Sequence, residues 1–403
     1  MVRLLALLPL VWVTGCPASP EGPVDAGGAL DAPLADAGPA ADAPTAPDAP
    51  SPAVDAPTGA DTPSPDAPSE PDAPPILHRN VRCGDPVPEG ATPPVLRPYS
   101  GAACPALVPG RNTIESGGRT RQFLLVVPTD LGPDERLPVL VMWHWLGGSA
   151  NSMLTRGQVQ VAADELRFIA IIPEKTGDVT IPIPFVDPID MVWPYLDFTS
   201  DARFEEELVF FDDLVACVSG AYAIDEHCIS TVGVSAGALW TGQLLQHRSD
   251  VLASAIVLSG GVGPASGLSF FDVRGFTEEP RPLPTLIAWG GPLDQCALRF
   301  ETASQNLEVE LEARGGFLVE CVHDCGHTEP PVEETMLGLG VLYRFAVDHP
   351  FWLAPGESPY FVRGLPSDTP TWCAIGAGNA TPRRGMCPSA LDSCPVPALP
   401  PGL

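Results

Sequence analysis

Residues 231–238 of the chain are Thr231-Val232-Gly233-Val234-Ser235-Ala236-Gly237-Ala238. The apolar run that ends at Val234 favours a short buried strand, and residues 236–247 after the serine are compatible with a helix. Glycines two positions before and two positions after the serine allow a sharp turn and a close approach of helix to strand. The pattern predicts a nucleophile elbow with Ser235 at its tip, although the same pattern also occurs in ordinary turns.

Apolar runs alternate with amphipathic runs on both sides of this stretch. Continuous apolar strands alternating with helices are typical of a mostly parallel sheet buried on both faces. We therefore predict an α/β fold with helices on both sides of a central sheet. Predicted strands cover residues 122–127, 139–143, 168–172, 229–234, 255–258, 285–289 and 317–322, and predicted helices cover residues 151–166, 204–219, 236–247, 300–314 and 332–347.

Composition divides the 403 residues into four predicted parts. Residues 1–15 combine one basic residue with a short apolar run, as a secretory signal does, and are too short to span a bilayer. Residues 16–77 are mostly Ala, Pro, Asp, Gly, Ser and Thr, which predicts a disordered, extended tether. Residues 78–350 hold the predicted α/β domain, and residues 351–403 form a cysteine-containing tail expected to pack on it.

The signal ends in Val13-Thr14-Gly15-Cys16, which resembles the lipobox of bacterial lipoproteins. In those proteins the cysteine is lipidated and becomes the new N-terminus, so the resemblance implies a lipid on Cys16. A plain secretory signal followed by an incidental cysteine is the alternative.

The chain is strongly acidic, with a formal net charge of −29 at pH 7. The tether carries only part of this charge, so the predicted α/β domain is acidic as well. Nucleic acids and anionic lipid headgroups bind basic surfaces, and both are therefore excluded as partners. The only expected contact with a membrane is through the lipid anchor.

Cysteine usage indicates an oxidising compartment. The chain has 11 cysteines, and setting Cys16 aside leaves ten, which in an exported protein predict a disulfide framework. Cys217 and Cys228 flank the turn between the predicted helix 204–219 and the strand before Ser235, so we predict a bridge between them. Oxidising conditions favour disulfides over metal, and no metal site is expected. Zinc is the competing interpretation for Cys321, His323, Cys325 and His327.

A serine hydroxyl becomes a good nucleophile only when an imidazole accepts its proton and a carboxylate orients that imidazole. In a doubly wound sheet these groups should lie on loops after later strands. Asp294 follows the predicted strand 285–289, and His327 follows the predicted strand 317–322. The order serine, aspartate, histidine is that of α/β-hydrolases. The alternatives left open are His323 as the base and Asp272 or Asp324 as the acid.

Residues from about 104 to 347 resemble the secreted esterases of the polyhydroxybutyrate depolymerase and feruloyl esterase group of α/β-hydrolases. The resemblance implies that Ser235 is the nucleophile, Asp294 the orienting acid and His327 the base. The matching motifs are Gly-Gly-Arg119-Thr-Arg-Gln-Phe, His144-Trp-Leu-Gly-Gly-Ser-Ala150, Gly-Val-Ser235-Ala-Gly, Gly-Gly-x-x-Asp294 and Gly326-His327-Thr328.

The resemblance also places an oxyanion hole at residues 144–148, with backbone N–H groups from Ala236 and from Trp145 or Leu146. The family commonly has His-Gly-x-Gly-Gly, whereas residue 145 is tryptophan here. A side chain is strained at positive φ, so we expect an altered hole if this position needs that angle. Trp193 lies in an irregular insertion and is the tryptophan predicted to contact the substrate, with packing in the core or at the rim as the alternative.

These patterns together predict an extracytoplasmic, lipid-anchored serine esterase that cleaves carboxylic esters through an acyl-enzyme. The resemblance implies feruloyl or acetyl esters of plant-wall polysaccharides, or short polyesters, as substrates, and no cofactor. A serine peptidase of the same fold is one alternative. A non-catalytic cell-surface binding module with a degenerate hydrolase fold is another, and Trp145 is the feature that motivates it.

Replacing the lipidation site tests the export prediction. The Cys16→Ser protein should leave the membrane fraction and keep the properties of its folded domain, because the lipid is the only expected anchor. Detergent-phase partitioning of mutant and wild type measures this. Equal membrane retention of the two proteins would contradict lipidation of Cys16.

Overall fold

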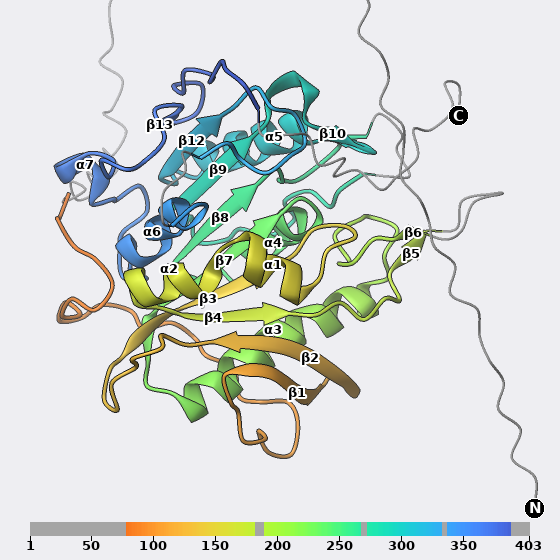
Figure 1. Ribbon diagram of the computed structural model, residues 1–403, viewed down its shortest axis with the longest axis vertical. Helices are drawn as coiled ribbons and strands as arrows, with labels where there is room; N and C mark the ends of the chain where they lie inside the picture. Colours follow the sequence, from red (N-terminus) through yellow and green to blue (C-terminus); the bar gives the residue numbers. More distant parts are fainter. Residues whose placement is uncertain (1–77, 182–188, 267–271, 333–336, 388–403) are drawn as a thin grey trace, which may run out of the picture. The chain divides into compact units, whose positions relative to one another are not determined.

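The computed structural model describes residues 78–181, 189–266, 272–332 and 337–387 (Figure 1). The sequence predictions for the signal, for Cys16 and for the tether lie outside these residues. Among the described residues, no helix is both long enough and apolar enough to cross a bilayer.

Nine strands of the described chain form the central sheet (Figure 1). The inner pairs from β4 to β12 are parallel, and the outer pairs β1–β2, β2–β4 and β12–β13 are antiparallel. In spatial order the strands are β1 (Gly110–Ser116), β2 (Arg119–Val126), β4 (Ile169–Pro173), β3 (Leu137–Trp143), β7 (Ile224–Val234), β8 (Ser254–Leu258), β9 (Thr285–Trp289), β12 (Leu318–Val322) and β13 (Cys373–Ile375).

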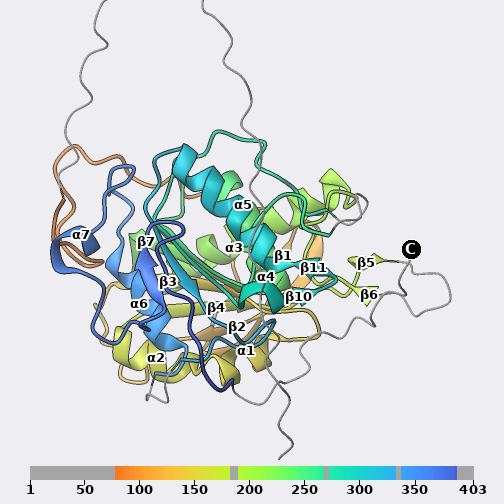
Figure 2. The same ribbon diagram turned by 90° about the horizontal axis from the view of Figure 1, so that it is seen from above.

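Helices cover both faces of this sheet, as predicted (Figure 2). Strands β3, β4, β8, β9 and β12 are buried along their whole length, because neither face meets water. Side chains alternate between two separate apolar cores, so Val141 and Trp143 pack on one side of β3 and Leu140 and Met142 on the other.

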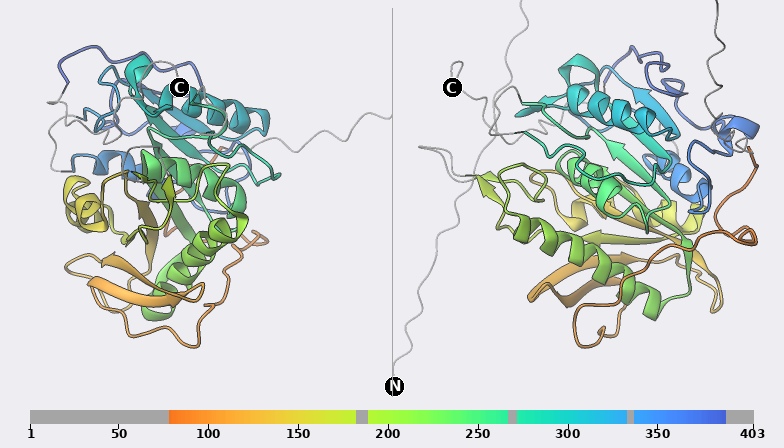
Figure 3. Two further views of the ribbon diagram at one scale, coloured as in Figure 1. Left: turned by 90° about the vertical axis from the view of Figure 1, so that its right-hand side faces the viewer. Right: turned by 180° about the vertical axis from the view of Figure 1, so that it is seen from behind.

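Of the longer helices in the described residues, three lie on each face of the sheet. Helices α3 (Asp201–Ala221), α4 (Ala236–His247) and α5 (Phe300–Ala313) cover one face, and they lie in front of the sheet when the molecule is seen from behind (Figure 3, right). Helices α1 (Ala150–Arg156), α2 (Val159–Leu166) and α6 (Gly340–Asp348) cover the other. The remaining short elements are β5 (Thr180–Ile181), β6 (Ile189–Asp190), η2 (Gly291–Leu293), β10 (Gln295–Cys296), β11 (Leu298–Arg299) and α7 (Tyr360–Arg363).

The single helix predicted at residues 151–166 is divided into α1 and α2. Gly157 lies between them, where an added Cβ would come within 2.7 Å of the Met153 carbonyl oxygen and 2.8 Å of the Tyr343 hydroxyl. Gln158 then adopts a left-handed conformation with φ of 48°. The break ends α1 at Arg156, whose side chain lines the pocket described below.

The predicted bridge between Cys217 and Cys228 is wrong. Cys104 is bonded to Cys217, and Cys83 is bonded to Cys228, with sequence separations of 113 and 145 residues. The reason is that α3 extends to Ala221 and β7 begins at Ile224, so the two cysteines lie inside a helix and a strand rather than beside a loop. Both bridges hold the segment before β1 against the sheet and its helices, one to β7 and one to α3.

Two further disulfides join the end of the chain to β12 and its following loop. Cys321 is bonded to Cys373, where β13 pairs with β12, and Cys325 is bonded to Cys387. Both cysteines of the zinc interpretation are therefore consumed in disulfides, and neither can supply the thiolate that zinc would require.

Removing one long-range bridge tests this arrangement. The Cys104→Ser/Cys217→Ser protein should lose about 2–5 kcal/mol of unfolding free energy, because the bridge restricts the unfolded chain. Urea unfolding of variant and wild type measures the loss. Peptide mapping of the unreduced protein should recover the Cys104–Cys217 pair, and a Cys217–Cys228 peptide would contradict it.

Candidate active site

Ser235 occupies the tip of the turn between β7 and α4, with φ of 54° and ψ of −118°. This conformation is rare for a residue with a side chain and is characteristic of a nucleophile elbow. An added Cβ on Gly233 would lie 2.2 Å from the Gly237 carbonyl oxygen, and one on Gly237 would lie 2.1 Å from the Trp143 carbonyl oxygen. Both positions therefore require glycine, and the backbones around them hold the strained serine in place.

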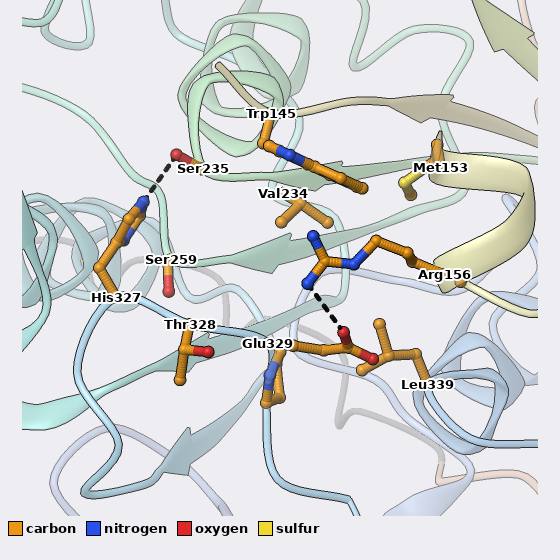
Figure 4. A pocket seen from close by; sticks show the side chains of 12 residues that line it. Trp145, Met153, Arg156, Val234, Ser235, Ser259, His327, Thr328, Glu329 and Leu339 are labelled. Carbon is orange, nitrogen blue, oxygen red and sulfur yellow. Dashed lines mark hydrogen bonds and ion pairs between the residues drawn. The ribbon is translucent and has the colours of Figure 1, made fainter. Parts of the chain in front are cut away.

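The structure brings Ser235, His327 and Asp294 into one hydrogen-bonded chain. The Ser235 Oγ lies 2.8 Å from the His327 Nε2 (Figure 4), and the His327 Nδ1 lies 2.6 Å from the Asp294 Oδ1. An ionised carboxylate can only accept, so it selects the tautomer with the proton on Nδ1. Nε2 is then free of a proton and faces the serine hydroxyl as an acceptor.

Asp294 is held rigidly because its second oxygen is also bonded. Oδ2 accepts hydrogen bonds from the Ser259 hydroxyl at 2.8 Å and from the Gly290 N–H at 2.7 Å, and the side chain is fully buried. Sequence reasoning missed Ser259. The signal that could have found it is its position directly after strand β8, at the sheet edge where Ser235 and Asp294 also lie.

The two loops that carry Asp294 and His327 are packed against each other. The Gly326 N–H donates to the Gly290 carbonyl at 3.0 Å, and an added Cβ on Gly290 would lie only 2.0 Å from the Gly326 carbonyl oxygen. Phe300 stacks on the His327 ring, with centroids 4.1 Å apart and planes 15° apart. These contacts fix both the position of the imidazole and the plane of its ring.

The expected oxyanion loop follows β3. Its turn is closed by a hydrogen bond of 2.9 Å from the Gly148 N–H to the Trp145 carbonyl. Trp145 is absent from the described non-glycine residues with positive φ, whereas Gly147 has φ of 74°. The tryptophan therefore causes no backbone strain at position 145. The donor roles of Trp145, Leu146 and Ala236 stay predictions.

The oxyanion loop is supported from beneath by a buried polar cluster. The Glu174 Oε2 accepts from the Ala150 N–H at the start of α1, and its Oε1 lies 3.5 Å from the His144 Nε2. His144 is fully buried and its Nδ1 lies 3.0 Å from the Trp145 carbonyl oxygen. Burial alone would raise the pKa of the Glu174 carboxyl, but its interaction with the nearby His144 ring and the hydrogen bond from the Ala150 N–H outweigh burial, so the pKa is lowered.

The prediction that Trp193 contacts the substrate is wrong. Its side chain is fully buried, and its Nε1 donates to the His144 carbonyl at 2.9 Å. Its ring meets Trp143 edge to face at 4.9 Å between centroids. Trp193 thus fills the core beneath the loop that follows β3.

The alternative site residues lie elsewhere. His323 is buried, and its Nδ1 accepts from the Cys325 N–H at 3.3 Å. Asp272 accepts from the Ser266 hydroxyl, and Asp324 pairs with Arg383. None of these three is bonded to Ser235 within the described part of the chain.

A pocket opens beside the serine hydroxyl (Figure 4). Counted as the space open to the centre of a water molecule, its volume is about 50 Å³. A single water needs roughly 10–15 Å³ on this measure, so the free space suits a small group. Its lining consists of Trp145, Met153, Arg156, Gly157, Val234, Ser235, Ser259, His327, Thr328, Glu329, Pro330 and Leu339.

Comparison with protein-family models and with curated proteins finds no match. Solved structures do match. Native pOPH is 21% identical with a TM-score of 0.54, over 68% of this chain and 97% of that one. Native sOPH is 20% identical with the same score and the same coverage. A ferulic acid esterase is 16% identical over 59% of this chain and 96% of that one, at a TM-score of 0.44.

Structural similarity at these sequence identities establishes the fold, and it does not establish an activity or a substrate. The chain has an α/β-hydrolase fold with a mostly parallel sheet and helices on both faces, which confirms the predicted fold class.

Part of the loss of stability in acid should be traceable to His323. Burial lowers the pKa of its imidazole to about 4, from 6.5 in the unfolded chain. As the pH falls, the unfolded state therefore binds the extra proton before the folded state does. The free energy of unfolding is not reduced by His323 above pH 6.5, and it decreases as the pH drops from 6.5 towards 4. At 1.36 kcal/mol per pKa unit this loss is about 3 kcal/mol.

Denaturant unfolding at pH 7, 5.5 and 4 measures the effect. The His323→Gln protein should lose about 3 kcal/mol less than wild type over this range, because it has no imidazole to charge. His78→Gln, at an exposed histidine, serves as the control. Equal losses in wild type and in His323→Gln would show that this histidine does not set the acid limit.

Proposed function

We propose that this protein is a serine hydrolase that cleaves carboxylic esters through an acyl-enzyme. The observation that carries the proposal is the chain of two short hydrogen bonds from Ser235 through His327 to the buried Asp294. These residues are drawn from three loops far apart in sequence, and they meet at a strained elbow. This arrangement has the geometry of a nucleophile, a general base and an orienting acid.

In the first half of the reaction the Ser235 Oγ attacks the ester carbonyl carbon while its proton passes to the His327 Nε2. The carbonyl oxygen becomes negative, and backbone N–H groups of Ala236 and of Trp145 or Leu146 stabilise it. The C–O bond to the alcohol then breaks, and the alcohol leaves with the proton from Nε2. In the second half His327 removes a proton from water as the water oxygen attacks the acyl carbon. The bond between that carbon and the Ser235 Oγ then breaks, Nε2 returns the proton to the serine oxygen, and the carboxylic acid leaves.

The site favours an ester hydrolase over both alternatives. A binding module would owe its loss of activity to Trp145, yet that residue does not need the backbone angle of a glycine. A peptidase needs room for an extended chain, whereas the free space beside Ser235 suits a small group. We propose short acyl esters as the substrates, such as acetyl groups on plant-wall polysaccharides or the units of short polyesters.

We also propose that the enzyme acts outside the cytoplasm and is held there by a lipid on Cys16. Four disulfides between described cysteines support an oxidising compartment, since such bridges rarely persist in a reducing one.

Triad variants test the mechanism. Ser235→Ala and His327→Ala should each reduce turnover of p-nitrophenyl acetate by about 10³-fold or more, and the double variant should be little worse, because the residues act as one unit. Asp294→Asn should cost less, because the serine and the imidazole remain.

A fluorophosphonate probe identifies the nucleophile independently of any substrate. It should label the wild type at Ser235, and peptide mapping locates the labelled residue. Labelling at another serine would place the site elsewhere, and folded protein that is neither labelled nor active would favour the binding module.

A further inference from the structure

The pocket beside Ser235 has two distinct ends. Ser235 and His327 lie at one side, and Met153, Arg156 and Leu339 lie at the other (Figure 4). Met153 and Leu339 are buried and apolar, so the end of the pocket away from Ser235 is lined by apolar side chains. A polymeric alcohol cannot enter so small a space, and the acyl group is therefore the part of the substrate that enters it.

An ion pair crosses this pocket. The Arg156 Nη2 lies 3.2 Å from the Glu329 Oε2, and the guanidinium carbon lies 5.0 Å from the centre of the Trp145 ring. Arg156 is the last residue of α1, and Glu329 follows His327 by two positions. The pair thus joins the two sides of the pocket, and Trp145 holds the guanidinium from a third direction.

We propose that the Arg156–Glu329 pair limits the length of the acyl group that this enzyme accepts, an inference that rests on the proposed ester hydrolysis. An acetyl group stops short of the pair, whereas a long chain has to pass it. Apolar methylenes in that position would strip water from both charges without replacing the lost hydrogen bonds. Each charge also neutralises the other, so the pair gives no net attraction for an anionic substrate.

The pair can be removed without damage to the fold. The side chains of Arg156 and Glu329 are 34% and 37% exposed, so neither leaves a buried charge when its partner is lost. Ion pairs with this exposure stabilise proteins by about 0–1 kcal/mol. A matched control exists in Arg344 and Asp368, which are 3.0 Å apart, are both 33% exposed and are absent from the lining of the pocket.

The experiment compares chain-length preference in the full-length protein. The kcat/KM values for p-nitrophenyl acetate, butyrate and octanoate are measured for wild type, Arg156→Ala, Glu329→Ala and Arg344→Ala. The ratio of octanoate to acetate should rise about tenfold or more in the first two variants, a change on the scale of added methylenes in an apolar pocket. The ratio should be unchanged in Arg344→Ala.

The outcomes separate this inference from the proposed function. Acetate turnover with an unchanged ratio in both pocket variants would overturn the inference and leave ester hydrolysis standing. An equal fall in kcat for all three esters would also overturn it, because the pair would then act by holding the His327 loop. A folded wild type that hydrolyses none of the esters would overturn the proposed function, and the inference with it.

Discussion

At Gly233 and Gly237 the backbones of β3, β7 and α4 approach so closely that no side chain fits between them. This contact presses the start of α4 onto the end of two neighbouring strands and leaves Ser235 in a conformation that few residues adopt. The strain of about 1–3 kcal/mol typical of such a residue has to be offset by its surroundings. Here the buried strands on either side supply that support, which places the hydroxyl at a fixed point on the sheet edge.

The side chains that meet Ser235 are fixed in a similar way, by contacts that leave them little freedom. Both oxygens of Asp294 are bonded, and the imidazole of His327 is bonded through both ring nitrogens and stacked on Phe300 on its face. Glu174 follows β4 and accepts a hydrogen bond from the Ala150 N–H, which supports the loop after β3. Ser259 follows β8 and donates a hydrogen bond that supports Asp294 in the same way. Preorganised polar groups of this kind lower the cost of stabilising charge during a reaction.

Local sequence patterns predicted the central strands and the elbow, because each depends on residues that are neighbours in the chain. The three-residue strand β13 has no such pattern and exists only because a disulfide and β12 hold it. Disulfides between cysteines that are 113 and 145 residues apart likewise leave no pattern in the local sequence. The predicted bridge was wrong because it joined the two cysteines nearest to each other in the chain. The prediction for Trp193 was wrong for a different reason. Composition can distinguish an irregular insertion from a strand, but it does not show which side chains of the insertion are buried in the core, as Trp193 is.

The two disulfides near His327 affect the order in which parts of the chain reach their final structure. Cys321 and Cys325 flank the start of the loop that carries the imidazole, and their partners Cys373 and Cys387 come from the far end of the sequence. A nascent chain that has emerged only as far as α6 holds the serine and the aspartate, yet its histidine loop lacks both bridges and the edge strand. Synthesis and oxidation therefore complete the His327 loop last, so the proposed triad would be assembled only after residues up to Cys387 have reached an oxidising environment.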